Sequence, residues 1–212
     1  MKTVILIGGT FNPITKAHLQ MGILAKSLFP DAEVHYVLSN MDFTSKWKKT
    51  AHGENFPPEG REELVREAIT PYGFILQNKE STGELSGATY DTVMYYKSIG
   101  YEKVYFCIGH DKLKQINRWK KSNNLAKEVT LLLFERDGKT KKDVQEDLSR
   151  WDIIEIPMCK TYNSISSTKI RNAFYAGNLE QVKNDLESCT YETLQTRYEQ
   201  YMKNKEDIYK HD

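Results

Sequence analysis

Six short apolar runs alternate along the chain with stretches that suit helices, and this alternation is the strongest constraint on the fold. Strands that are separated by helices pair in parallel, in a sheet that helices cover on both faces. The sequence therefore predicts an α/β protein with a doubly wound parallel sheet, and a small helical portion at about 164–205 near the C-terminus. The expected strands lie at 4–7, 34–38, 74–76, 104–108, 129–134 and 153–156, the clearest helices are expected at 18–28, 61–69, 89–98 and 168–175, and residues 179–203 also have helical character.

The first apolar run leads directly into the segment Gly8-Gly9-Thr10-Phe11-Asn12-Pro13-Ile14-Thr15-Lys16-Ala17-His18. Its two glycines permit a turn with close backbone approach, and its proline fixes φ just before an amphipathic stretch. The N–H groups and dipole at the start of a helix attract anions, and His18 lies near enough to add a hydrogen bond or a charge. The segment is a candidate phosphate site, although a glycine turn of purely steric origin and a structural histidine remain alternatives.

A second candidate helix start lies far along the chain, in Ser164-Ile165-Ser166-Ser167-Thr168-Lys169-Ile170-Arg171. Hydroxyl side chains cap helices well, and helical patterning continues from Thr168 to Tyr175. Arg171 lies one turn inside this helix, where its forked guanidinium could hold a phosphate at two points. An ordinary cap with a solvated arginine is the alternative.

These segments share a position relative to the expected strands. Gly8–His18, Asn40, Gly109–Asp111 and Ser164–Arg171 each follow an expected strand. Ligands of open α/β sheets bind beyond the carboxyl ends of the strands, where the strand order switches. We therefore expect one site to collect all four segments.

The overall composition restricts the class of partner and the compartment. The chain has 212 residues, 30 basic and 29 acidic side chains and a net charge of +1, so it has no global field that favours nucleic acid or an anionic membrane. Cys107, Cys159 and Cys189 are widely spaced and show no metal-ligand pattern, as expected in a reducing compartment. The apolar start is too short to span a membrane and lacks a signal-peptide cleavage site. We expect a cytoplasmic protein that binds neither nucleic acid nor membrane.

The two phosphate-type segments, together with Leu38-Ser39-Asn40, Thr89–Thr92, Ile108-Gly109-His110-Asp111 and Trp119, resemble the nucleotidylyltransferase superfamily. The chain is most similar to the nicotinate or nicotinamide mononucleotide adenylyltransferases. The resemblance implies a Rossmann-like fold and a single nucleotidylyltransferase domain over residues 1–212. It also implies transfer of AMP from ATP to a pyridine mononucleotide, with release of pyrophosphate, in NAD biosynthesis. One position departs from the usual pattern: Thr15 stands where the superfamily has the first of two histidines. Some members of the superfamily likewise have a single histidine.

The resemblance also assigns roles to individual residues. His18 and Arg171 are expected to be catalytic. Trp119 is expected to stack on the pyridine ring, with a packing role as the alternative. Asp111 is expected to bond a ribose hydroxyl, and it could also cap a helix that starts at Lys112. Lys48 is taken from the lysines of a long irregular segment, residues 41–60, that is expected near the acceptor. The expected ATP-binding residues are Gly8, Gly9, Thr10, Phe11, Thr15, His18, Ser166, Ser167, Thr168 and Arg171, and the expected mononucleotide-binding residues are Asn40, Lys48, Thr89, Gly109, Asp111 and Trp119.

Such a transfer needs position and charge more than proton removal, because a phosphate nucleophile is already anionic. The expected cofactor is Mg²⁺ bound through the ATP phosphates, with no metal site built from protein ligands. A related nucleotidylyltransferase with another acceptor and a non-catalytic nucleotide-binding regulatory protein are the alternative functions. The choice between nicotinate and nicotinamide stays open, as does a homo-oligomer formed through the C-terminal helices.

Overall fold

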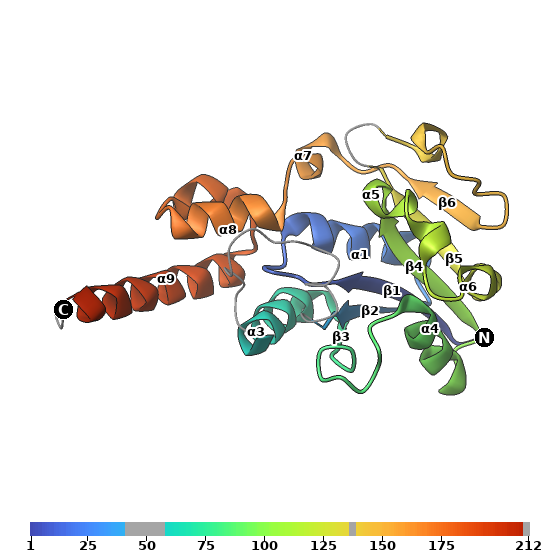
Figure 1. Ribbon diagram of the computed structural model, residues 1–212, viewed down its shortest axis with the longest axis horizontal. Helices are drawn as coiled ribbons and strands as arrows, with labels where there is room; N and C mark the ends of the chain where they lie inside the picture. The colour runs from blue at the N-terminus through green and yellow to red at the C-terminus, as the bar shows by residue number, and fades with distance from the viewer. Residues whose placement is uncertain (41–57, 136–138, 210–212) are drawn as a thin grey trace.

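The computed structural model describes residues 1–40, 58–135 and 139–209 of the chain (Figure 1). Its centre is a six-stranded sheet in the order β3-β2-β1-β4-β5-β6, in which every neighbouring pair is parallel. This is the strand order of a Rossmann-like doubly wound fold. All six expected strands are confirmed, as β1 (Thr3–Gly9), β2 (Glu33–Leu38), β3 (Ile75–Gln77), β4 (Lys103–Gly109), β5 (Thr130–Phe134) and β6 (Asp152–Ile156).

The expected long helices are present, and of three further short ones only α5 was considered from the sequence, as a helix starting at Lys112. The short helices α5, α6 and α7 have four to seven residues, too few for the 3.6-residue periodicity to be visible in the sequence. The helices are α1 (Lys16–Leu28), α3 (Pro58–Ile69), α4 (Thr89–Ser98), α5 (His110–Leu113), α6 (Ser122–Glu128), α7 (Lys160–Asn163), α8 (Ser167–Tyr175) and α9 (Ser188–Tyr209), with 3₁₀ turns at Thr70–Tyr72, Ile116–Arg118, Lys141–Asp143 and Leu179–Asp185.

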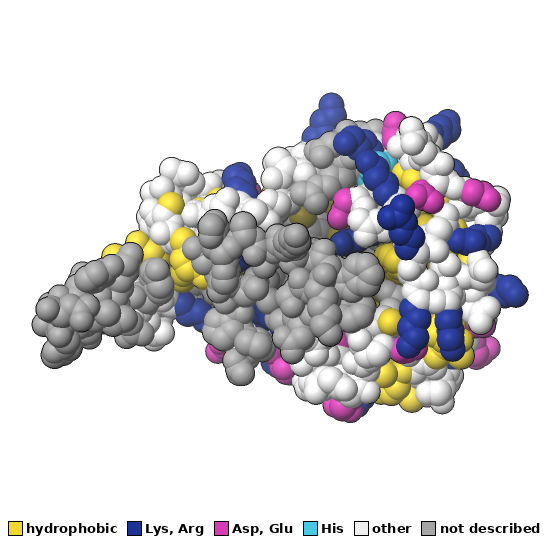
Figure 2. Space-filling model, in the orientation of Figure 1, with side chains coloured by type: hydrophobic (Ala, Val, Ile, Leu, Met, Phe, Trp, Pro, Cys, Tyr) yellow, Lys and Arg dark blue, Asp and Glu magenta, His cyan; other side chains and the backbone are white. Residues whose placement is uncertain are grey.

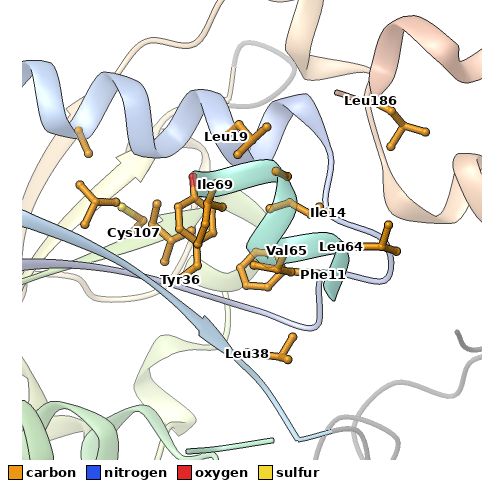
Figure 3. Packing of buried hydrophobic residues seen from close by; sticks show 14 of the residues in the cluster. Phe11, Ile14, Leu19, Tyr36, Leu38, Leu64, Val65, Ile69, Cys107 and Leu186 are labelled. Carbon is orange, nitrogen blue, oxygen red and sulfur yellow. The ribbon is translucent and has the colours of Figure 1, made fainter. Parts of the chain in front are cut away.

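The sheet has a hydrophobic core on each face, as the doubly wound interpretation requires. Side chains of α1, α3, α8 and α9 pack on one face, and Figure 3 shows part of this core between α1, α3 and the sheet. Side chains of α4, α5 and α6 pack on the other face. Residues of β1 alternate between the two cores, with Ile5 and Ile7 in the first and Val4 and Leu6 in the second.

Two expected boundaries were wrong. Gly8 and Gly9 are not the turn itself but the last two residues of β1, where they pair with Val37 and Leu38. Of residues 41–60, expected to be irregular, 58–60 form the start of α3, and 41–57 lie outside the described residues. The helical character expected for residues 179–203 is confirmed, as a 3₁₀ turn over Leu179–Asp185 followed by α9 from Ser188.

The central strand pair opens at its carboxyl end, at the switch point between β1 and β4. The ladder of β1 and β4 stops at Ile7 and Cys107, whereas β1 stays paired with β2 to Gly9 and β4 stays paired with β5 to Gly109. Gly8 is exposed although its strand lies in the middle of the sheet. The fold therefore leaves an accessible opening at the place where the sequence predicts a ligand.

Candidate active site

The turn between β1 and α1 forms the floor of the site. Thr15 is the N-cap of α1 and is 1% exposed, and it forms a capping box with His18. The first turn of α1 contains no acidic residue. The positive end of its dipole is therefore not neutralised by a carboxylate of the helix itself.

His18 is held in one orientation by Thr15. The backbone N–H of Thr15 lies 3.2 Å from Nδ1 of His18, and the Thr15 hydroxyl lies 2.9 Å from the same atom. A backbone N–H can only donate, so Nδ1 accepts and the ring proton lies on Nε2. The threonine that replaces a histidine in the superfamily pattern thus orients the remaining histidine.

Gly9 is required by packing within the turn. A Cβ at Gly9 would lie 2.8 Å from the ring of Phe11, whose own φ is +43°. The Phe11 ring is buried and meets the His18 ring edge-on, with 5.2 Å between ring centroids. The steric explanation for this glycine therefore applies whether or not a phosphate approaches it.

The second phosphate-type segment directly contacts the first. Ser166 caps α8, and the Ser167 hydroxyl donates to the carbonyl oxygen of Pro13 at 2.8 Å. Nη1 of Arg171 donates to the carbonyl oxygen of Asn12 at 2.7 Å, and Nη2 donates to the Thr168 hydroxyl at 3.3 Å. Two segments more than 150 residues apart in the chain are thereby joined into one site.

Arg61, which received no catalytic assignment from the sequence, supports the same turn from below. It is 1% exposed, and Nη1 donates to the carbonyl oxygens of Thr10 at 2.7 Å and Ser39 at 3.3 Å. Both of these bonds lie inside the fold. They tie the end of β2 to the turn after β1.

The ends of β2 and β4 place Asn40, Gly109 and Asp111 near the switch point. Asn40 follows β2 and is half-buried, and Asp111 is exposed in the first turn of α5. A Cβ at Gly109 would lie 2.9 Å from an oxygen of the Asp111 carboxylate. The capping role considered for Asp111 was wrong, because α5 begins at His110 with Gly109 as its N-cap.

Thr89 and Trp119 lie on the α4 side of the opening. Thr89 is the first residue of α4, whose N-cap Ala88 provides no side-chain hydrogen bond. The half-buried Trp119 packs edge-on against Phe106 at 5.9 Å, and a Cβ at Gly8 would lie 3.3 Å from the same Phe106 ring. Trp119 thus has both a packing contact and a position near the end of β1.

An ion pair joins the two elements that carry Thr89 and Trp119. Nζ of Lys120 lies 2.6 Å from the carboxylate of Asp91 in the first turn of α4. Figure 2 shows Lys and Arg side chains spread over the part of the molecule that contains α4, α5 and α6. This ion pair connects the start of α4 to the segment of Trp119.

The remaining candidates are Lys48, His110 and the groups that could hold a metal ion. Lys48 lies outside the described residues. His110 was given no role, yet its Nε2 is buried without a hydrogen-bond partner among the residues that the structure describes. Within those residues there is no group of three His, Cys, Asp or Glu that could hold a metal ion, and none of their helices is long and apolar enough to cross a membrane.

An open parallel sheet with two helix starts joined above its switch point defines a nucleotide-binding α/β protein. The sequence pattern of the cytidylyltransferase-like family matches residues 6–173. The chain belongs to this family and is a nucleotidyltransferase.

Curated relatives narrow the position within the family. A probable nicotinate-nucleotide adenylyltransferase of Clostridium perfringens is 32% identical over 177 residues, covering 81% of this chain and 85% of the relative. A protein of the same name from Staphylococcus saprophyticus is 33% identical over 174 residues, covering 80% and 84%.

Solved structures share the fold. The Plasmodium falciparum nicotinic acid mononucleotide adenylyltransferase complexed with NaAD has a TM-score of 0.73 and 23% identity, covering 94% of this chain and 98% of that one. The same protein complexed with APC has a TM-score of 0.73 and 22% identity over the same shares. At this identity the likeness concerns the fold.

Proposed function

We propose that this protein transfers the adenylyl group of ATP to the phosphate of nicotinate mononucleotide. A phosphate oxygen of the mononucleotide forms a bond to the α-phosphorus of ATP, and the bond from that phosphorus to the pyrophosphate oxygen breaks. The products are a pyridine dinucleotide and pyrophosphate. The observation that carries the proposal is the direct contact of the two phosphate-type helix starts at the switch point.

On the ATP side, this chain provides donors for a polyphosphate. The turn from Gly9 to Phe11 and the start of α1 present backbone N–H groups, and the Nε2 proton of His18 is the donor that Thr15 orients. Ser167, Thr168 and Arg171 add hydroxyl and guanidinium donors from α8. Fixed donors of this kind stabilise charge that builds on the α-phosphate and on the departing pyrophosphate.

On the acceptor side, Trp119 offers a ring face for the pyridine, and Asp111 offers an exposed carboxylate for a ribose hydroxyl. Asn40, Thr89 and Gly109 surround the same opening from three different elements. Asn40 follows β2 and Gly109 ends β4, the two strands that flank β1 in the sheet. The two substrates would then meet over the ends of β1 and β4.

The start of α4 favours nicotinate over nicotinamide. Its N-cap is an alanine, so no side chain satisfies the first N–H groups of this ten-residue helix. A carboxylate oxygen placed there would accept hydrogen bonds more strongly than a neutral amide oxygen, and the ion pair of Asp91 with Lys120 offsets the acidic charge in this first turn. The names of the curated relatives agree with this preference.

A divalent ion, Mg²⁺, fits the proposal as a companion of ATP. When bound, it would neutralise charge on the ATP phosphates and shield them from the attacking phosphate. Phosphate oxygens and water would hold the ion, and the hydroxyls and cations described above would hold the nucleotide itself. This chain's residues act by binding and orienting the phosphates.

Pyrophosphate release by the purified protein with ATP and magnesium tests the proposal. Nicotinate mononucleotide, nicotinamide mononucleotide and no acceptor are compared in parallel, and we expect the highest kcat/KM with nicotinate mononucleotide. His18→Asn should lower kcat by about 10²-fold or more, with only a small fall in melting temperature, because asparagine keeps an acceptor for the Thr15 N–H. Absence of release with both pyridine acceptors would overturn the proposal, and equal kcat/KM for the two would overturn the preference.

A further inference from the structure

Glu80 is a buried carboxyl group that the sequence gave no reason to single out. It lies three residues beyond the end of β3 and is 5% exposed. The Thr92 hydroxyl donates to its Oε1 at 2.5 Å, and the Ser39 hydroxyl donates to the same carboxyl. No salt bridge to Glu80 occurs among the described residues. Burial of a carboxyl group costs free energy unless hydrogen bonds compensate for it, and here the two hydroxyl groups provide those bonds.

Both partners of Glu80 lie close in the chain to residues at the acceptor side of the proposed site. Ser39 directly precedes Asn40 at the end of β2, and Thr92 completes the first turn of α4, which begins at Thr89. Thr92 is 1% exposed, so its hydroxyl faces the interior of the fold. Through these two bonds, Glu80 ties the start of α4 to the end of β2.

The connection continues from Ser39 to the turn that binds phosphate in the proposed function. The Ser39 N–H donates to the carbonyl oxygen of Gly9 at 2.9 Å. Its carbonyl oxygen accepts from Arg61, which also donates to the carbonyl oxygen of Thr10. A continuous series of hydrogen bonds therefore runs from α4 through Glu80 and Ser39 to the turn after β1.

We propose that Glu80 is a positioning residue that fixes the start of α4, and with it the pyridine mononucleotide, relative to the ATP phosphates. The inference rests on the proposed function. An apolar side chain could fill the same volume, but it could not direct two hydroxyls from two different elements. Hydrogen bonds constrain both distance and angle, and alignment of the attacking phosphate depends on that constraint.

The test compares Glu80→Leu with Glu80→Gln. Leucine has a similar volume and removes both hydrogen bonds, whereas glutamine keeps an acceptor for Thr92 and offers Ser39 a donor. We expect Glu80→Leu to raise the KM for nicotinate mononucleotide about tenfold, as the loss of one to two net hydrogen bonds implies. We expect the KM for ATP to stay within about twofold, since Arg61 still holds the turn after β1, and Glu80→Gln to restore most of the loss.

Thr92→Val gives a nearly isosteric second variant in case Glu80→Leu does not fold. Its matched control is Thr130→Val, because Thr130 also donates to a carboxylate, that of Asp152 at 2.6 Å, at the amino end of β5, away from the site. Thr92→Val should raise the KM for the mononucleotide, and Thr130→Val should not, at comparable losses of melting temperature. If Thr92→Val changed the KM for both substrates equally, or changed neither, the inference would be overturned. The proposed function would still stand if the wild-type protein turned over nicotinate mononucleotide. A wild-type protein inactive with pyridine mononucleotides would overturn both.

Discussion

Nη1 of Arg171 donates a 2.7 Å hydrogen bond to the carbonyl oxygen of Asn12, a residue 159 positions earlier in the chain. This bond, with that of Ser167 to Pro13, holds the start of α8 against the turn that precedes α1. The phosphate-binding surface that we propose is therefore built from both segments, which these two bonds join.

Arg171→Lys separates the charge of this side chain from its forked geometry. Lysine keeps the positive charge but cannot bond both Asn12 and Thr168 as the guanidinium does. We expect kcat/KM for ATP to fall about ten- to hundredfold, with a small change in melting temperature. Steady-state kinetics with ATP as the varied substrate measure the effect. Arg66→Lys, at an exposed arginine paired with Glu62, is the control, and an equal effect in both variants would contradict the prediction.

Thr15→Val removes the hydroxyl that caps α1 and faces His18. Loss of an N-cap should lower the free energy of unfolding by about 0.5–2 kcal/mol, and kcat should also fall because the His18 ring loses its orientation. Urea unfolding and turnover measure the two effects separately. Thr15→Ser keeps the hydroxyl and should retain both properties. If Thr15→Val lowers stability without lowering kcat, Thr15 has no part in orienting His18.

Stability should fall as the pH drops below about 6.5 because of a buried histidine at the opposite end of the sheet. The buried His35 ring donates from Nε2 to Glu33 at 3.1 Å and lies 2.8 Å from the Tyr96 hydroxyl. Burial lowers the pKa of His35 below its usual value of 6.5, against the raising effect of Glu33. The unfolded chain then takes up the proton more readily, so the stability is fully present above pH 6.5 and decreases as the pH falls towards the folded-state pKa.

Urea unfolding at pH 8, 6.5 and 5.5 checks this dependence. The measurements stay above the range in which Glu33 protonates, because the Tyr101 hydroxyl, His35 and Lys2 lower the pKa of that carboxyl. His35→Gln should flatten the pH dependence. An unchanged slope in His35→Gln would assign the effect to another group.

The cysteines should differ sharply in their reactivity towards a thiol reagent. Cys107 is buried, and burial raises the pKa of its thiol well above the usual value of 9. Cys159 is exposed, and hydrogen bonds from Thr161 lower the pKa of its thiol. The thiolate is the reactive form, so Cys159 should react quickly in the native protein and Cys107 only after unfolding. The rapid phase of the reaction should vanish in Cys159→Ser. A rapid phase that persisted in this variant would show that the fast-reacting thiol is not Cys159.

The sequence predicts the sheet and the helix starts around the site well, because both depend on local patterns. Apolar runs mark buried parallel strands, and a hydroxyl before an amphipathic stretch marks a helix start. Ser166 is indeed the cap of α8, and Thr89 is the first residue of α4. The roles of the individual site residues stay predictions, Lys48 among them.

Glu80 and Arg61 show what local patterns cannot reveal. Glu80 lies among polar residues that look like a solvated connection, yet it is buried, and one of its hydrogen-bond partners, Ser39, is far away in the chain. Arg61 looks like an exposed helical arginine, yet it is 1% exposed because its partners are backbone carbonyls of two distant turns. Such contacts are set by the packing of strands and become visible only in three dimensions.

The order of the elements along the chain has a consequence for synthesis. A ribosome would release all six strands and α1 before Ser167 and Arg171 emerge, so the sheet could assemble while the turn near Asn12 and Pro13 still lacked its late partners. A nascent chain that ends after β6 would then possess the sheet but not the finished anion site. Competence for ATP would arrive as one of the last events of folding, when α8 closes over a turn made at the very beginning.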